Sequence, residues 1–125
     1  MKNTINLAVM GIDHGHIFDM LDEMIKEGCN CNHFWTEGSP LTLNEFNKKY
    51  PNIKRVENKS EILKDNKIDM ILISSIPKDR AALSIEALKS GKDVMVDKPG
   101  CTTLNQLKDL KRIVKETGKI WSVNF

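Results

Sequence analysis

The chain has 125 residues, of which 40% are hydrophobic and 29% are charged, a composition typical of one soluble globular domain. Its 19 Lys and Arg residues against 17 Asp and Glu leave a formal charge of +2, too small for the basic surface that nucleic-acid binding requires. The longest apolar runs, such as that from Met70 to Ile73, are far shorter than the ~20 residues that span a bilayer. We therefore expect neither nucleic acid nor a membrane as a partner.

The N-terminal sequence and the cysteines indicate the compartment. Residues 1–4 lead directly into an alternating stretch, without the apolar core of a signal peptide. The 3 cysteines include a closely spaced Cys29-x-Cys31 pair, which does not make an ordinary disulfide framework. We therefore expect reduced thiols in a cytoplasmic protein.

The chain alternates predicted strands and helices. Short apolar runs indicate the strands, and apolar residues that recur every three or four positions indicate the helices. Gly28 and Gly118 stand where helix C-terminal glycines belong, and Thr103-x-x-Gln106 is a capping box. The expected elements, in chain order, are a strand over 5–12, a helix over 17–25, a strand over 32–36, a helix beginning at Ser39-Pro40, a very short strand at Val56, a brief helix capped by Ser60, a strand over 69–75, a helix over 79–90, a strand over 93–97, a helix opened by the capping box and a strand over 120–125.

Strands that alternate with helices through short turns predict an α/β fold, a parallel sheet with helices on both faces. Right-handed crossovers make the doubly wound (Rossmann) strand order 3-2-1-4-5-6 the expected topology. No repeat or linker interrupts the pattern, so residues 1–125 are expected to form one domain. In such a fold, ligands bind outside the carboxyl ends of the strands, at the switch point between the first and fourth strands. Residues 11–16, 74–80 and 97–100 are expected there.

The first predicted strand ends in the turn Gly11-Ile12-Asp13-His14-Gly15-His16. A dinucleotide-binding turn needs a glycine for the bend, a small second residue that lets pyrophosphate approach the backbone, and a helix N-terminus behind it. Gly11 meets the first requirement, whereas Asp13 and His16 replace the second and third glycines. Because a carboxylate beside pyrophosphate would repel it, we expect Asp13 to turn away and cap the following helix.

Glu37 follows the second predicted strand, about 20 residues beyond the turn. A carboxylate at this position can accept hydrogen bonds from an adenine ribose, and it would disfavour a 2′-phosphate. With no neighbouring Arg, Glu37 predicts NAD rather than NADP. The alternative is a solvated acid in a loop.

His14 and His16, next to Asp13, also admit a metal site, because two imidazoles and a carboxylate can bind zinc. A His-x-His turn does not by itself make its ligands converge, and His33 lies on another predicted strand. The expectation is therefore that no metal is bound.

A second motif, Asp97-Lys98-Pro99, lies at the end of the fifth predicted strand. Together with residues 87–94, it is similar to the pattern A-L-x-x-G-K-x-V-x-x-E-K-P, in which Asp97 stands for the Glu. Residues 68–73 are similar to an I-D-x-V-x-I strand. Over essentially its whole length, the chain therefore resembles the N-terminal domain of the glucose-fructose oxidoreductase, inositol dehydrogenase and rhizopine-catabolism (Gfo/Idh/MocA) family.

The resemblance implies an NAD(P)-dependent oxidoreductase that transfers hydride to or from a sugar, cyclitol or related polyol. It implies a catalytic Lys98 near nicotinamide and substrate, and it aligns Arg80 with a frequent His of the family. The family has a second domain, which contains the substrate pocket and an Asp-x-x-x-His pair and through which homo-oligomers would form. This domain has no counterpart in residues 1–125. The candidate cofactor-binding residues are Gly11, Ile12, Asp13, His14, His16, Glu37, Ser74, Ser75, Pro77, Asp97 and Lys98.

Two alternatives from other classes remain open. Asp13 and the missing second domain favour a nucleotide-binding or interaction module without chemistry, in which the glycine turn is degenerate. A methyltransferase also needs a glycine turn and an acid after its second strand, although the Asp97-Lys98-Pro99 motif argues against it. Titration with NADH, NADPH and S-adenosylmethionine distinguishes the three.

Overall fold

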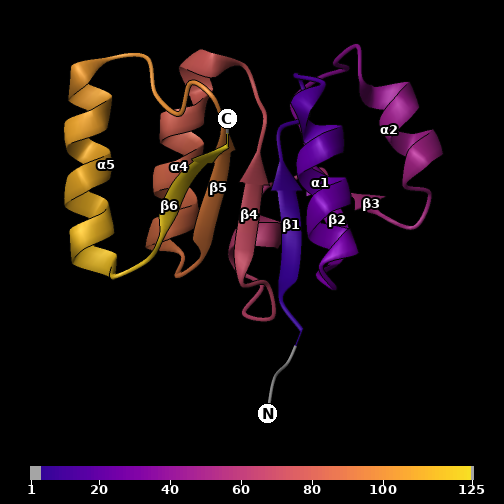
Figure 1. The fold of residues 1–125 in the computed structure, drawn as a ribbon, viewed down its shortest axis with the longest axis horizontal. Helices are drawn as coiled ribbons and strands as arrows, with labels where there is room; N and C mark the ends of the chain where they lie inside the picture. The colour runs from indigo at the N-terminus through magenta and orange to yellow at the C-terminus, as the bar shows by residue number, and fades with distance from the viewer. Residues whose placement is uncertain (1–3, 125) are drawn as a thin grey trace.

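The computed structural model describes residues 4–124 as a 6-stranded parallel sheet flanked by helices (Figure 1). The strand order is β3-β2-β1-β4-β5-β6, which confirms the predicted doubly wound topology. The end of the last predicted strand, Phe125, and the N-terminal residues 1–3 lie outside the described residues. In chain order the elements are β1 (Asn6–Met10), α1 (His16–Lys26), β2 (Asn30–Trp35), α2 (Leu43–Lys49), β3 (Lys54–Arg55), α3 (Ser60–Leu63), β4 (Met70–Ile73), the 3-10 helix η1 (Pro77–Asp79), α4 (Arg80–Lys89), β5 (Asp93–Asp97), α5 (Leu104–Thr117) and β6 (Trp121–Asn124).

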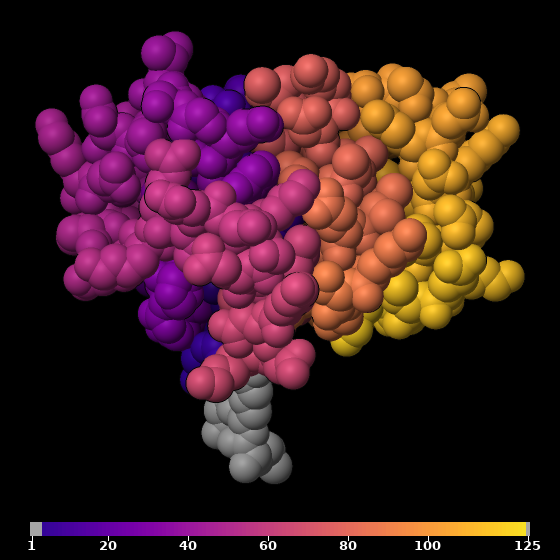
Figure 2. Space-filling model, turned by 180° about the vertical axis from the view of Figure 1, so that it is seen from behind, coloured from indigo at the N-terminus to yellow at the C-terminus, as the bar shows by residue number. Residues whose placement is uncertain are grey.

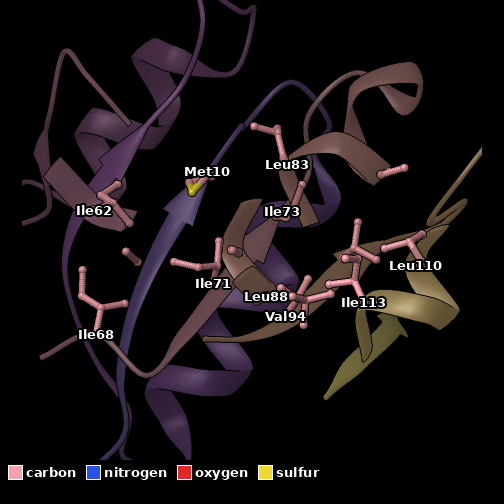
Figure 3. Close-up of a cluster of buried hydrophobic side chains, with 14 residues drawn as sticks. Met10, Ile62, Ile68, Ile71, Ile73, Leu83, Leu88, Val94, Leu110 and Ile113 are labelled. Carbon is pink, nitrogen blue, oxygen red and sulfur yellow. The ribbon is translucent and has the colours of Figure 1, made fainter. Parts of the chain in front are cut away.

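The sheet separates two hydrophobic clusters. Under α4 and α5, alternate residues of the central strands, such as Ile71, Ile73 and Val94, pack against Leu88 and Leu110 (Figure 3). Seen from behind in Figure 2, the salmon-to-yellow residues of α4, α5 and β6 occupy one side of the molecule. The second cluster lies under α1 and α2. Because side chains alternate between the two faces, a strand that is covered on both must be apolar throughout.

Two predicted elements begin at other residues than expected. The helix expected at Ser39-Pro40 begins at Leu43, after a turn in which the Pro40 carbonyl accepts a hydrogen bond from the Leu43 N–H. The short strand expected at Val56 is Lys54–Arg55, and the Val56 N–H still donates to Phe34 at 2.8 Å.

Ser60 does not cap α3. Lys59 occupies the N-cap position and makes no side-chain cap bond. Instead, the Asn58 side-chain oxygen accepts a hydrogen bond from the Ser60 N–H at 3.0 Å. By contrast, the capping box of Thr103 and Gln106 at the start of α5 is confirmed.

Lys92, between α4 and β5, is a lysine with only 2% of its surface exposed. Its ammonium group donates to the carbonyl oxygens of Asp65 (2.7 Å) and Ile68 (3.0 Å). Burial lowers the pKa of Lys92, whereas the Asp65 and Asp69 carboxylates raise it. The Lys of the Gly91-Lys92 motif therefore holds the segment that leads into β4 against the start of β5.

Over residues 4–124, none of the helices is long and apolar enough to cross a membrane.

Candidate functional site

The carboxyl ends of four neighbouring strands meet at one edge of the sheet, where the strand arrows of Figure 1 point. Hydrogen bonds between backbone groups hold this edge together. The Gly11 N–H donates to Trp35 at 2.7 Å, the Ser74 N–H to Gly11 at 3.1 Å, and the His14 N–H to Ser74 at 3.0 Å. The predicted residues after β1, β2, β4 and β5 thus lie next to one another, in sheet order.

Gly11 is the tightest point of this edge. Its φ angle is +92°, a left-handed conformation that favours glycine. A Cβ atom at Gly11 would lie 2.5 Å from Ser75 Cβ and 2.9 Å from Ser75 Cα. Glycine is therefore required both by the backbone conformation and by the close approach of the β1 turn to the end of β4.

A cavity of about 310 Å³ opens beside Gly11, within the usual ~300–1,000 Å³ range of ligand pockets. The predicted residues Gly11, Asp13, Glu37 and Ser75 line one part of it. Trp35, Lys59, Ile76, Asp79, Ala82, Leu83 and Glu86 complete the lining. Of these, Ile76 and Asp79 lie within the predicted range 74–80. The sequence contained no signal for the others, because only the folded sheet brings the end of β2, the start of α3 and the first turns of α4 to this cavity.

Asp13 does not cap α1, which begins without a side-chain cap bond. Its half-buried carboxylate lines the cavity instead. Burial raises the pKa of Asp13, opposed by hydrogen bonds from the backbone N–H groups of Asp13 and Ile76 and reinforced by Asp79 and Glu37. The predicted helix cap is thus wrong, and the carboxylate is held toward the end of β4.

Glu37 is exposed at the rim of the same cavity. The expectation that no Arg neighbours it is wrong, since Arg55 of β3 reaches the end of β2. The Arg55 guanidinium donates to the carbonyl oxygens of Thr36 (3.0 Å) and Gly38 (2.6 Å), on both sides of Glu37. Sequence reasoning missed it because β3 pairs with β2 only in the folded sheet.

Asp97, at the end of β5, is completely buried. Its Oδ2 atom accepts hydrogen bonds from Ser74 Oγ (3.1 Å) and Arg80 Nη2 (3.4 Å). Its Oδ1 atom lies 2.9 Å from His16 Nδ1. The structure therefore brings together three of the predicted residues, from β4, β5 and the start of α1, around one buried carboxylate.

Sequence reasoning did not single out Arg80 beyond its alignment with a family His. It is 1% exposed, and it donates to the carbonyl oxygens of Ser75 (2.8 Å) and Lys98 (2.6 Å) as well as to Asp97. Burial lowers the pKa of Arg80, and the Asp97 carboxylate raises it. Arg80 thus joins the ends of β4 and β5 and balances the Asp97 charge.

The side chain of Lys98 is exposed, and it does not line the cavity beside Gly11. It lines a second cavity, of about 350 Å³, on the α1 side of β5, together with His16, Met95 and Asn124. The predicted crevice is therefore two cavities, which lie on either side of the turn between β1 and α1.

Two further predicted residues lie away from both cavities. The Ile12 side chain is in the cluster under α1 and α2. Its N–H donates to Thr36 Oγ1 at 3.3 Å, and its carbonyl accepts from the Thr42 hydroxyl. Pro77 is exposed at the start of η1. Both residues shape the loops that surround the site.

These features fit a dinucleotide. The glycine turn lets a ligand approach the backbone, and α1 behind it presents the partly positive end that phosphate prefers. A carboxylate for ribose hydroxyls stands after β2. Fold and site thus define a nucleotide-binding α/β domain of the doubly wound class.

Comparison with known proteins identifies the family. Residues 5–125 match the GFO_IDH_MocA model, described as an oxidoreductase family with an NAD-binding Rossmann fold. The chain therefore belongs to the Gfo/Idh/MocA oxidoreductase family.

Individual relatives agree with this assignment. The chain is 34% identical over 74 residues to an uncharacterised oxidoreductase, YdgJ, of Escherichia coli, covering 59% of this chain and 21% of YdgJ. It is 35% identical over 69 residues to scyllo-inositol 2-dehydrogenase (NAD(+)) of Bacillus subtilis, covering 55% of this chain and 20% of that protein. A crystal structure from Erwinia carotovora atroseptica has a TM-score of 0.91 at 34% identity, covering 95% of this chain and 35% of that one. The chain thus spans about a fifth of the two curated relatives.

Proposed function

We propose that the chain binds a nicotinamide dinucleotide and is the cofactor domain of a cytoplasmic oxidoreductase, in the reducing compartment that its free cysteines favour. The observation that carries the proposal is the turn that begins at Gly11. This turn packs closely against Ser75, leads into α1 and has a cavity on each side. Residues around Glu37 would bind the adenosine half of the dinucleotide. The turn after Gly11 would bind the pyrophosphate, and the residues around Lys98 would bind the nicotinamide. The bound nicotinamide would supply the hydride chemistry.

The charges around the first cavity favour NAD over NADP. Four acids line it, Asp13, Glu37, Asp79 and Glu86, against one cation, Lys59. The Lys59 ammonium already pairs with Glu86 at 2.8 Å. Such a lining accepts hydrogen bonds from ribose hydroxyls and repels a 2′-phosphate. The Arg55 guanidinium already donates hydrogen bonds to two backbone carbonyl oxygens.

We expect NADH to bind more tightly than NADPH, and Glu37→Ala to narrow the difference by about 1 kcal/mol, the order of a charge-assisted hydrogen bond. Calorimetric titration of the chain with both cofactors and with S-adenosylmethionine measures this. Glu45→Ala, which removes an exposed acid of α2, is the matched control and should leave the preference unchanged. Tight NADPH binding without NADH binding would refute the preference, and S-adenosylmethionine binding alone would support a methyltransferase.

The substrate of the proposed enzyme is a sugar, cyclitol or related polyol. The name of the Bacillus subtilis relative, scyllo-inositol 2-dehydrogenase (NAD(+)), supports this class.

Proton transfer at a carbinol needs acid–base groups placed against the hydride centre, and Lys98 alone does not supply a full set of them. We therefore expect the chain of 125 residues to show no NAD-dependent turnover of inositols or hexoses in an absorbance assay for NADH. Turnover would mean that this domain contains the whole catalytic machinery.

Lys98 is the proposed catalytic residue. In a protein that joins this chain to a substrate-binding domain, Lys98→Ala should leave NAD affinity within a few-fold but lower kcat roughly a hundredfold, as the loss of a positioned proton-transfer group does. The comparison is with Lys108→Ala, which removes an exposed lysine of α5. Steady-state kinetics of the two variants test this prediction, and an unchanged kcat for Lys98→Ala would exclude a catalytic role for Lys98.

A further inference from the structure

His14, His16 and Asp97 form a compact cluster at the edge of the sheet where the strands end. His14 lies in the turn between β1 and α1, and His16 is the first residue of α1. Asp97, at the end of β5, lies 81 residues beyond His16. His16 Nδ1 lies 2.9 Å from Asp97 Oδ1, and His14 Nδ1 lies 3.5 Å from Asp97 Oδ2. Within residues 4–124, this is the one group of three His, Cys, Asp or Glu residues whose candidate ligand atoms all lie within 4.8 Å of one another.

The distances match those between ligands of one metal ion. Zinc binds imidazole nitrogen and carboxylate oxygen at about 2.0–2.2 Å, which sets neighbouring ligand atoms roughly 3 Å apart. In the sequence, the carboxylate next to the two histidines is that of Asp13, but the sequence does not indicate that these three side chains converge. The fold supplies Asp97 in its place, because the carboxyl ends of β1 and β5 share one edge of the sheet.

The hydrogen bonds indicate how the His14 ring is protonated. The His16 backbone N–H donates to His14 Nδ1 at 3.1 Å, so this nitrogen has no proton, and its one lone pair would exchange this hydrogen bond for a bound ion. The same nitrogen faces an oxygen of the Asp97 carboxylate at 3.5 Å, and neither atom can donate a hydrogen bond to the other. A cation between them would turn this repulsion into attraction.

The carboxylate is held in place as metal-binding carboxylates are. Asp97 is 0% exposed, and Ser74 Oγ and Arg80 Nη2 both donate to its Oδ2 atom. Hydrogen bonds of this kind orient a ligand before the metal arrives. The histidine side chains are 53% (His14) and 43% (His16) exposed, which leaves a path for an ion and room for water.

We propose that His14, His16 and Asp97 bind one divalent transition-metal ion of the imidazole-preferring class, such as Zn²⁺. Two nitrogens and one carboxylate oxygen favour such ions over Mg²⁺ and Ca²⁺, which prefer oxygen ligands alone. Three protein ligands leave the exposed coordination positions free for water or for an oxygen of a bound molecule. His16 also lines the cavity of Lys98.

Calorimetric titration of the chelator-treated, tag-free chain with Zn²⁺ alone tests the proposal. The expected result is one ion per chain, with His14→Ala and His16→Ala each weakening binding at least tenfold. His33→Ala, which removes a half-buried histidine of β2, is the matched control and should bind like the unaltered chain. Because no dinucleotide is present, the result is independent of the cofactor proposal.

The rival zinc site is the Cys29-x-Cys31 pair, whose thiols are free. A Cys29→Ser variant should therefore keep its affinity for Zn²⁺. Titration with Co²⁺ adds a spectroscopic signature, since coordination by imidazole and carboxylate lacks the charge-transfer absorption of a thiolate. Asp97→Asn, checked for folding by circular dichroism, should also weaken binding. Binding that is absent, that survives both histidine substitutions, or that disappears with Cys29→Ser would overturn the proposal.

Discussion

Replacing Arg80 by Met should lower the free energy of unfolding by about 3–5 kcal/mol, the usual result of removing one partner of a buried ion pair. The guanidinium is 1% exposed and donates to the Asp97 carboxylate and to the carbonyl oxygens of Ser75 and Lys98. Met fills similar space but leaves the buried charge of Asp97 without its cation. Urea unfolding followed by circular dichroism measures the loss.

The matched control is Arg112→Met. The Arg112 side chain is 57% exposed and pairs with Glu116 on the surface of α5 at 3.3 Å, so its loss should cost less than about 1 kcal/mol. The double variant Arg80→Met/Asp97→Asn should regain part of the stability, because the unpaired charge is then removed. If Arg80→Met were as stable as Arg112→Met, the buried pair would not hold the ends of β4 and β5 together.

Gly11→Ala should have the second large effect, for two reasons that add. A left-handed conformation at a residue other than glycine costs about 1–3 kcal/mol, and the new Cβ would lie 2.5 Å from Ser75 Cβ. Forcing extra atoms into a packed region costs about 1–3 kcal/mol more. We expect lower stability in urea, and no NADH binding under conditions in which the variant is still folded.

Gly15→Ala is the control for the stability part of this prediction. Gly15, four positions along the same turn, has a φ angle of −63°, and a Cβ there would meet no atom within 4 Å. Its substitution should change the free energy of unfolding by no more than about 1 kcal/mol. If the two substitutions lowered the free energy of unfolding equally, the close approach of Gly11 to Ser75 would not contribute to the stability of the fold.

The strands, the helices and their order could be predicted because each leaves a local pattern in the sequence. The apolar run of β4 follows from its burial on both faces. The α5 capping box is a local arrangement of two side chains. The convergence of Gly11, Ser74 and Asp97 also follows from topology, since parallel strands bring their carboxyl ends to one edge.

The parts that could not be predicted depend on contacts between distant segments. Arg55 reaches the end of β2 only through the pairing of β2 with β3. The start of α2 is set by a hydrogen bond from Thr42 to Ile12, on the turn after β1. The cluster of His16 with Asp97 joins positions 81 residues apart. Sequence periodicity reports which residues are buried, but not which buried groups meet.

Chemical-shift mapping of the isotope-labelled chain with NAD⁺ tests the proposed dinucleotide site most directly. At 14.2 kDa, the chain is small enough for its backbone amides to be followed one by one. We predict saturable shifts concentrated along one edge of the sheet, at the turn after Gly11, beside Glu37, at Ser75 and around Asp97. An absence of shifts at millimolar NAD⁺, or shifts confined to another surface, would contradict the proposed dinucleotide site.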